Sequence, residues 1–406
     1  MRAFRAVRLA IAAGAVLVLA AGTFAGSGAA RAASQTATGA AAANGPAPAQ
    51  PIPGRTTGSG ATANQSRLSR AAATSFTITG ELNGVAAVSP SNVWAVGYSG
   101  LWPNEKILIV HWNGQRWTQI ASPKPVYGDI FGIDAVSADD IWLVGCTSKA
   151  AGANERLLML HWNGKQWSKP GGFPVISGQL DAVTVYHDDV WAVGATGGNG
   201  NYNPLVVRLT GGHWYFDPVP TPKGGLLWGV AATAAKSVWA FGDNHVNYTS
   251  TLVHWSGGVW GSVAFPMRGK GTRLLSIAAG PRGTAWAVGR YVVDNGPISS
   301  IALAWAGGAW HKTVIPAGAT QSDLNAVCAI PGGEAWAVGW GYYPDASGLL
   351  ALRWTGTSWV RVPTPAQTGT YGLFACSASS ASNAWAVGTT GDSQTEIVHW
   401  NGKTWG

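Results

Sequence analysis

A tetrapeptide of the form Trp-Ala-Val-Gly, or a near copy of it, recurs seven times along this chain at intervals of 47 to 50 residues. Its seven tryptophans are Trp94, Trp142, Trp191, Trp239, Trp286, Trp336 and Trp385. A fixed period of about 40–50 residues is typical of chains built from repeated supersecondary units. The repeat therefore constrains the fold more than any other feature of the sequence.

Each repeat reads as four short strands separated by turns. In the sixth repeat the apolar runs are 324–329, 335–339, 349–354 and 359–362, with Pro-Gly-Gly and Thr-Gly between them. Short runs of this kind, bounded by Gly and Pro, are typical of strands, and no helical periodicity is present. Seven such units predict an all-β fold, a seven-bladed β-propeller of four-stranded antiparallel blades. Asn-Gly pairs at 113–114, 163–164 and 401–402 favour a two-residue turn between the third and fourth strands.

The two ends of the repeat region suggest how the ring closes. The last repeat stops at Gly406, where its fourth strand begins, and an extra apolar segment at 76–79 precedes the first repeat. We predict that this N-terminal strand pairs with the outside of the last blade and closes the ring. The alternative is that 76–79 belongs to the preceding linker.

The first 74 residues are predicted to lie outside the propeller. Residues 1–32 have the pattern of a signal peptide, with three arginines, an apolar run of 13 residues and Ala-Arg-Ala at 30–32. That run is shorter than the roughly 20 residues that a spanning helix needs, although a short membrane anchor is the alternative. Residues 33–74 are rich in Ala, Gly, Pro and Ser, which predicts a disordered linker before a propeller at 75–406. We expect a secreted monomer, extracellular or cell-wall associated, without membrane insertion.

The formal net charge of +8 does not predict binding to nucleic acid. Four of the 26 basic residues lie in the signal peptide and three in the linker, which leaves 19 basic and 18 acidic residues in the propeller. Nucleic-acid binding needs clustered positive charge. We therefore expect no nucleic-acid partner.

The three cysteines, Cys146, Cys328 and Cys376, admit one disulfide in an oxidising compartment. Cys328 and Cys376 occupy nearby positions in neighbouring repeats and are the more plausible pair. They are offset by one residue, and successive residues of a strand point to opposite faces. We therefore favour three buried free thiols, with this pair as the alternative.

Most tryptophans and four of the eight histidines are predicted to be structural. Twenty of the 23 tryptophans occupy three recurrent positions, which indicates packing between blades because each blade has them. Four histidines precede tryptophans in the third strands of four different repeats: His111, His161, His254 and His399. They lie too far apart to share a metal ion, and the sequence indicates no metal site and no cofactor.

Binding residues are expected on one face of the ring, which we call the loop face. The loops between second and third strands and the connections between blades emerge there, and they are long and differ from repeat to repeat. Eight of the ten tyrosines lie in them. The candidate binding residues are Tyr98, Trp102, Tyr127, Asp129, Tyr202, Trp228, Tyr248, Arg290, Tyr291, Trp340, Tyr342, Tyr343 and Tyr371. Variable loops on a rigid scaffold usually carry binding, whereas local packing over the blade tips is the alternative.

The hairpin between third and fourth strands resembles the Asp-box of sialidase-type (BNR) propellers. Trp-Asn-Gly-Lys-Thr-Trp at 400–405 has the Gly, Thr and closing Trp of that box, with Trp in place of its Asp, and 162–167 resembles it more weakly. The chain also resembles secreted bacterial proteins of Trp-Ala-Val-Gly repeats. Both resemblances imply a propeller fold and leave the activity open.

A catalytic function has little support in the sequence. Of the arginines that a sialidase-like site would need, only Arg273 and Arg290 are near candidates. Asp134 and Asp181 are predicted to share a first-strand position in adjacent blades, and two such carboxylates in the channel could serve a hydrolase or lyase. We instead expect a non-catalytic module that binds a glycan or cell-surface polymer through the loop face, with an extracellular protein partner as the alternative.

Overall fold

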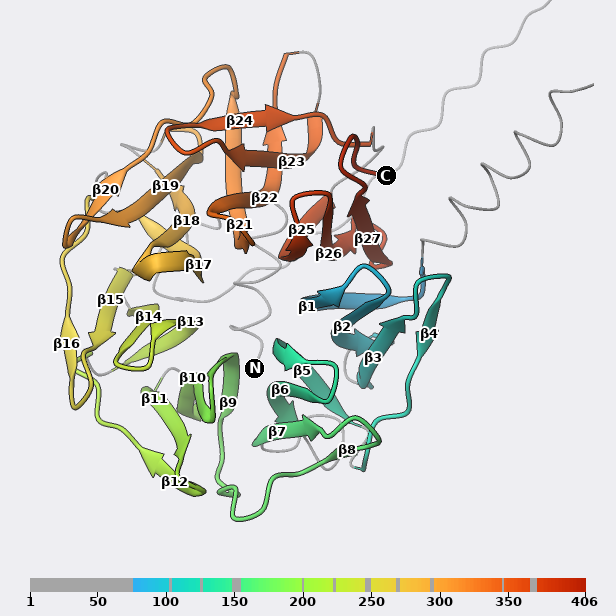
Figure 1. Ribbon diagram of the computed structural model, residues 1–406, viewed down its shortest axis with the longest axis vertical. Helices are drawn as coiled ribbons and strands as arrows, with labels where there is room; N and C mark the ends of the chain where they lie inside the picture. The colour runs from blue at the N-terminus through green and yellow to red at the C-terminus, as the bar shows by residue number, and fades with distance from the viewer. Residues whose placement is uncertain are drawn as a thin grey trace, which may run out of the picture.

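The computed structural model describes residues 76–406, except for 102–103, 125–126, 148–154, 199–200, 222–223, 245–249, 268–270, 293–295, 345–346 and 366–370. The predicted signal peptide and linker lie outside the described residues. The described part forms seven antiparallel sheets arranged as blades around one axis (Figure 1), which confirms the predicted all-β propeller. Its one short helix, η1 (Pro281–Gly283), lies in the first turn of the fifth blade. None of the described helices is long and apolar enough to cross a membrane.

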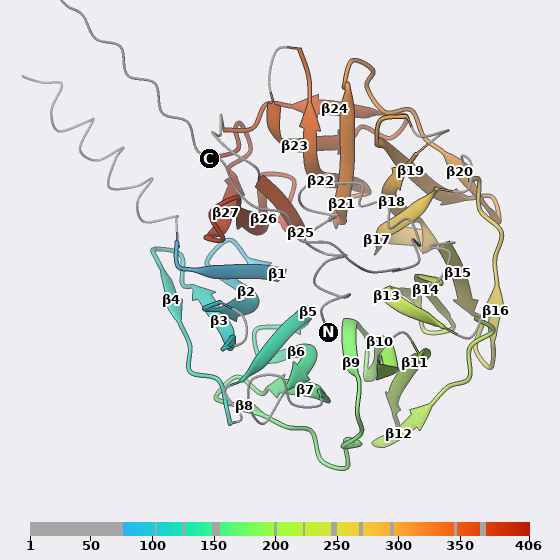
Figure 2. The same cartoon turned by 180° about the vertical axis from the view of Figure 1, so that it is seen from behind.

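Each blade runs from an inner strand at the axis to an outer strand at the rim (Figure 2). The inner strands are β1 (Gly80–Ser89), β5 (Gly128–Ser137), β9 (Gln179–Tyr186), β13 (Gly225–Ala234), β17 (Arg273–Ala279), β21 (Gln321–Ile330) and β25 (Tyr371–Ser380). The second strands are β2 (Asn92–Ser99), β6 (Asp140–Thr147), β10 (Asp189–Gly198), β14 (Ser237–Asn244), β18 (Ala285–Tyr291), β22 (Glu334–Tyr342) and β26 (Asn383–Thr390). The third strands are β3 (Lys106–Trp112), β7 (Arg156–Trp162), β11 (Asn201–Thr210), β15 (Ser250–Trp255), β19 (Ser299–Ala306), β23 (Ser347–Trp354) and β27 (Thr395–Trp400). The outer strands are β4 (Trp117–Gln119), β8 (Trp167–Ser168), β12 (His213–Phe216), β16 (Trp260–Ser262), β20 (Ala309–Lys312) and β24 (Trp359–Val362).

The core of the molecule lies between the blades. Each pair of adjacent blades shares one apolar cluster, and one of the clusters joins the seventh blade to the first. In the cluster between the first two blades, Trp94 packs on Trp162 and Trp167 of the next blade, with ring centroids 5.1 and 5.5 Å apart. The repeated tryptophans are therefore packing residues, as their spacing predicts. Because each large aromatic buries about 150–250 Å², they account for much of the apolar area between blades.

The histidines before the third-strand tryptophans are structural as well. The His399 ring stacks on Trp385 with centroids 4.1 Å apart, and its Nε2 lies 2.8 Å from Asn383 Oδ1. His111 and Asn92 repeat this arrangement in the first blade at 2.9 Å. Burial lowers the pKa of His399 to about 4. Within the described ranges, no group of three or more His, Cys, Asp or Glu residues could hold a metal ion.

The hairpins with Asn-Gly are not two-residue turns. Trp112 pairs with Trp117, so the loop between them has four residues. Asn113 Oδ1 accepts hydrogen bonds from the backbone N–H groups of Gln115 and Arg116, both at 3.0 Å. Of these four loop residues, only Gly114 has a positive φ. The same Asn side-chain bonds recur in the other two Asn-Gly hairpins. The side-chain acceptor, rather than a turn with positive φ at both positions, fixes this loop.

The seventh sheet has three assigned strands, and residues 78–79 and 405–406 lie along β27. Trp405 forms an isolated bridge with Trp400, and Gly406 exchanges backbone hydrogen bonds with His399. On the N-terminal side, Thr79 bridges Gln394, and Thr395 donates its backbone N–H to the Ile78 carbonyl at 2.9 Å. Residues 76–79 are not assigned as a strand, so a closing N-terminal strand stays a prediction.

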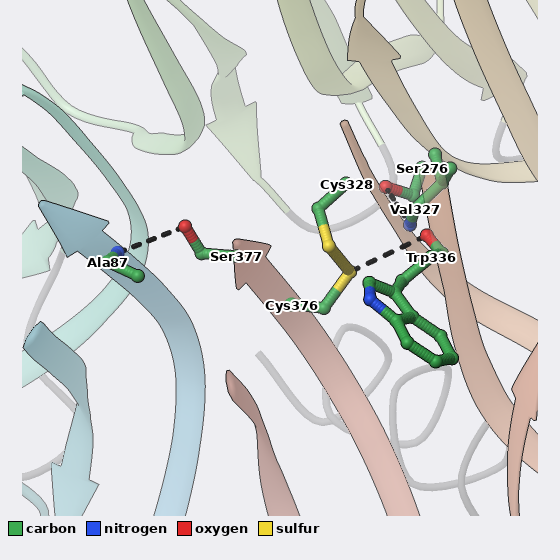
Figure 3. Close-up of a disulfide and its surroundings, with 7 residues drawn as sticks. All are labelled: Ala87, Ser276, Val327, Cys328, Trp336, Cys376 and Ser377. Atoms are coloured by element: carbon green, nitrogen blue, oxygen red, sulfur yellow. Dashed lines mark hydrogen bonds between the residues drawn. A yellow bond between two sulfur atoms is a disulfide. The ribbon is translucent and has the colours of Figure 1, made fainter. Parts of the chain in front are cut away.

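Cys328 and Cys376 form a disulfide between the sixth and seventh blades, with their Cα atoms 5.7 Å apart (Figure 3). The prediction of three free thiols is thus wrong, and only Cys146 is free and buried. Cys328 lies opposite Trp336 on β22, and Cys376 lies opposite Ala386 on β26. Both of these partners belong to the cluster between the two blades. Equivalent strands of two stacked sheets meet through opposite faces, so the one-residue offset brings the thiols together.

Candidate functional site: the axial cavity and its rim

Every inner strand contains a β-bulge at the same place. The pairing of each inner strand with its second strand skips one residue in its first half, and in six blades this residue lies 11 positions before the repeat tryptophan. The seven bulge residues are Asn83, Phe131, Asp181, Trp228, Leu275, Asn325 and Phe374. Bulges often re-aim a side chain at a functional position. Here seven different side chains are placed at equivalent positions around the axis.

The glycine of Trp-Ala-Val-Gly faces this bulge from the second strand. A Cβ added at Gly97 or at Gly339 would overlap the carbonyl oxygen of Glu81 or Asp323 on the inner strand, and the other five repeat glycines make the same close approach. The residue that follows each bulge is Gly, Ala or Ser, and a Cβ on Gly132 would lie 2.9 Å from Cα of Ala182 in the next inner strand. Small residues are therefore required at two positions, on the second strand opposite the bulge and directly after the bulge residue. The bulge residue itself can vary.

The bulge residues line a cavity on the ring axis with a volume of about 260 Å³. All other lining residues except Phe241 also belong to the inner strands, mostly to their first halves. Since the inner strands begin at the loop face, the cavity lies on that side of the ring. Its wall combines aromatic rings (Phe131, Trp228 and Phe374) with polar groups (Asn83, Asp181, Arg273 and Asn325). A concave site with an apolar lining and a few converging polar groups is the usual form of a ligand site.

Two asparagines fix the polar part of the wall by reaching across to the next blade. Asn83 Nδ2 donates to Asp129 Oδ1 and to the Ile130 carbonyl, both at 3.0 Å. Asn325 Nδ2 donates to the Leu373 carbonyl at 3.0 Å. In both cases the carbonyl belongs to the residue directly before the bulge residue of the next blade. The asparagine of one blade therefore helps to hold the bulge of the next blade in place.

Charged residues of the fourth to sixth blades form buried pairs beside this wall. Arg273 pairs with Asp243, and Arg290 NH1 donates to Asp323 Oδ2 at 2.9 Å. Burial raises the pKa of Asp323, while the charge of Arg290 opposes that rise. In the neighbouring third blade, Asp181 is only 3% exposed and accepts two hydrogen bonds from Gln179 Nε2 at 2.8 and 3.0 Å.

Asp134 and Asp181 do not share a position, contrary to the prediction. Asp134 lies opposite the repeat tryptophan Trp142, and its equivalent in the third blade is Thr184. The Asp134 carboxylate accepts the backbone N–H of Val185 in the next blade at 2.7 Å, and burial raises the pKa of Asp134 to about 6. Ser377 makes the same link between the last and first blades by accepting Ala87 N–H at 3.0 Å (Figure 3). Asp134 therefore joins blades, whereas Asp181 faces the cavity.

Of the candidate residues named from the sequence, Trp228 lines the cavity. Asp129 and Arg290 lie beside its wall, bonded to Asn83 and Asp323. The side chain of Tyr202 is buried in a small cluster against which Trp228 packs.

The prediction that the remaining aromatic candidates lie in loops is mostly wrong. Tyr98, Tyr291, Trp340 and Tyr342 lie at or near the ends of second strands, whereas Tyr127 and Tyr343 lie between strands. Tyr98, Tyr127, Tyr291 and Tyr343 are half-buried, Trp340 is buried, and Tyr342 is 43% exposed. Trp340 contacts Tyr342 edge-to-face at 5.3 Å, and the Arg361 guanidinium lies 3.8 Å from the Tyr343 ring centre. Tyr371 lies in β25, and Trp102 and Tyr248 lie outside the described residues.

The sequence also predicts that Asp181 faces the channel, as the structure shows, but it does not single out the other five bulge residues, although a signal for them exists. Each inner strand carries the pattern Leu or Ile, then a variable residue, then Gly, Ala or Ser, as in Leu-Asn-Gly at 82–84 and Leu-Phe-Ala at 373–375. The variable position is the bulge residue. This single variable position within a uniform pattern is the sequence signal for the seven bulge residues around the axis.

These features define the chain as a seven-bladed β-propeller with an axial cavity. No protein-family model and no curated protein matches the sequence. Solved structures of similar fold include YCF48 bound to a D1 peptide, at 14% identity over 80% of this chain and 94% of that chain, with a TM-score of 0.51. A fucose-specific lectin from Aleuria aurantia matches at 15% identity over 71% and 94%, with a TM-score of 0.44. YjhT matches at 11% identity over 71% and 98%, with a TM-score of 0.46. At 14% identity the likeness to YCF48 shows the fold alone.

Proposed function

We propose that this protein is a secreted, monomeric, non-catalytic binding module that recognises an extracellular glycan or cell-surface polymer at its loop face. The proposal rests mainly on the position of the axial cavity, whose aromatic and polar wall lies on the same side of the ring as the tyrosines at the ends of the second strands. Aromatic rings contact the C–H faces of sugars, and amide and carboxylate groups bond their hydroxyls. Rings that keep a polar edge suit such partly wet surfaces.

A protein segment is the second candidate ligand. The YCF48 structure, which shares the propeller fold, is a complex with a D1 peptide. Tyrosine and tryptophan also dominate protein-binding surfaces. Fold similarity by itself does not carry over a ligand, so the two candidates are separated by experiment.

The test is co-sedimentation of the full chain with insoluble cellulose, chitin, chitosan, xylan and peptidoglycan. Tyr342→Ala combined with Tyr98→Ala removes rings from the loop face. The matched control is Tyr215→Ala in β12, because Tyr215 and Tyr342 are both 43% exposed but Tyr215 lies on an outer strand. We expect at least tenfold weaker binding for the loop-face variant and unchanged binding for the control.

Two outcomes would overturn the glycan proposal. Binding to none of the five polymers would exclude these glycan classes and leave a protein segment as the better ligand. Equal loss of binding in the loop-face variant and in Tyr215→Ala would show that the loop face has no special role.

A further inference from the structure

The polar groups of the cavity wall mostly offer hydrogen-bond acceptors. Asn83 uses both hydrogens of its amide on Asp129 and Ile130, which leaves its Oδ1 for a ligand. Asn325 is 94% buried by its neighbours, and its Oδ1 has no hydrogen-bond partner among the described residues. A buried acceptor without a partner costs about 1–3 kcal/mol, so a ligand that donates to it would recover this loss.

Among the described residues, the formal charge of the cavity wall is negative. Glu81 and Asp181 contribute carboxylates to the wall, and Arg273, the arginine among these lining residues, pairs with Asp243. Arg273 also lies near Asp323, since its charge acts on that carboxyl group. A cation is therefore favoured in this cavity over an anion.

The aromatic residues suit the same ligand. Phe131, Trp228 and Phe374 are half-buried bulge residues from the second, fourth and seventh blades, so rings face the axis from separate directions. The face of an aromatic ring attracts a cation by about 0.5–2 kcal/mol, and most strongly where water is excluded. A compact group with several N–H or O–H donors and a positive charge would meet both parts of the wall.

The size and position of the cavity limit how such a group can enter. A volume of about 260 Å³ is below the roughly 300–1,000 Å³ of sites for drug-sized ligands, which matches one small ring. Seven inner strands surround the cavity (Figure 1), so a polymer cannot pass through it sideways. Only the end of a chain can reach it from the loop face.

We propose that the axial cavity binds the terminal sugar of a glycan chain, and that this sugar carries a protonated primary amine. The inference deepens the proposed function and rests on it. Asp181 holds the ammonium group, with Gln179 fixing the carboxylate. Asn83 and Asn325 accept hydrogen bonds from the ring, and Trp228, Phe131 and Phe374 contact its apolar faces.

The test is calorimetric titration of the full chain with glucosamine, glucose and N-acetylglucosamine. We expect glucosamine to bind at least tenfold more tightly than the two uncharged sugars. Asp181→Asn should weaken glucosamine binding at least tenfold and change glucose binding less than twofold. Asp139→Asn is the matched control, because Asp139 lies in an exposed turn on the opposite face of the ring and should bind like the unaltered chain. Thermal unfolding of each variant shows that it is folded.

Three results would overturn the inference, and they differ from a failure of the proposed function. Equal affinity for glucose and glucosamine would remove the role of the amine. Binding to polysaccharides without binding to any of the three monosaccharides would place recognition outside the cavity and leave the proposed function intact. Binding of Nα-acetyl-lysine methylamide without binding of glucosamine would make a peptide lysine the occupant.

Discussion

The contacts between blades and the wall of the axial cavity are built on opposite principles. Between blades, equivalent positions carry the same residue type, as in the repeat tryptophans Trp94, Trp239 and Trp336, each packed on tryptophans of the next blade. Around the cavity, equivalent positions carry Asn, Phe, Asp, Trp and Leu. A residue repeated in every blade meets a need that every blade has, which is packing. Residues that differ at one structural position have no such common need, and they are the better candidates for recognition.

The largest effect should follow from removing a uniform residue. Trp336 is fully buried and packs on Trp400 and Trp405. Trp336→Ala should lower the free energy of unfolding by about 3–5 kcal/mol, because it removes a large buried side chain and leaves a cavity. Phe131→Ala at a half-buried bulge position should lower it by roughly 1 kcal/mol in the same urea titration. Similar losses at the two sites would contradict the distinction between packing and recognition positions.

The disulfide should have the next largest effect on stability. It closes a loop of 48 residues between the sixth and seventh blades. Replacing both cysteines by alanine should lower the free energy of unfolding by about 2–4 kcal/mol, since the open chain has more unfolded conformations. Cys146→Ala, which removes the free buried thiol, is the control. Mass spectrometry of the unreduced protein should show one intramolecular bond, and three reactive thiols under denaturing conditions would refute it.

A smaller effect is expected where the uniform and variable parts meet. Gly339→Ala places a Cβ against the Asp323 carbonyl opposite the sixth bulge. Overpacking of this kind costs about 1–3 kcal/mol, and it should also shift Asn325 and weaken ligand binding. Gly258→Ala in the turn between β15 and β16 is the contrast, because its Cβ would meet nothing within 4 Å and its φ is not positive. Unchanged ligand binding in Gly339→Ala would show that this glycine does not affect the position of Asn325 in the binding site.

The smallest effect concerns pH. His399 has its pKa lowered to about 4 by burial, from about 6.5 in the unfolded chain. Between these values the unfolded state binds a proton that the folded state does not, so stability falls as the pH is lowered from about 6.5 to 4. His399→Asn should reduce this fall by roughly 1 kcal/mol, because solvent screens the partly exposed ring. Asp134→Asn should make this fall steeper. The raised pKa of Asp134 stabilises the folded protein at low pH, and this stability is lost as the pH rises through about 6.

The sequence predicts the repeated features well and the variable ones poorly. The spacing of Trp-Ala-Val-Gly predicts seven blades, and the strand pattern predicts the four positions within a blade. The bulges cannot be derived from that pattern, because alternation along a strand does not show where one residue is skipped. The predicted shared position of Asp134 and Asp181 is wrong for this reason: Asp181 is itself the skipped residue, and the second blade skips another residue, Val136, before its turn, whereas the third blade does not. The Cys328–Cys376 bond could not be derived in this way either, because alternation along a strand describes the faces of one sheet and not which faces of two sheets meet.

The site was predicted only in part for the same reason. The loop aromatics are visible in composition, but their burial depends on contacts between blades, and Tyr202 and Trp340 prove to be buried. Trp228 is a candidate from the sequence because it lies outside the three recurrent tryptophan positions. Asn83, Asn325 and Phe374 each look like ordinary strand residues when one repeat is considered alone. Comparison of all seven inner strands shows that they occupy one position.

The most direct test of the central claim replaces variable cavity residues together. We would compare the full chain with a Phe131→Leu, Asp181→Asn, Phe374→Leu variant, measuring thermal unfolding and binding to chitosan, a polymer of glucosamine. The account predicts an unfolding temperature within a few degrees of the unaltered chain and at least tenfold weaker binding. Equal chitosan binding by two folded proteins, or no binding by the unaltered chain, would contradict it.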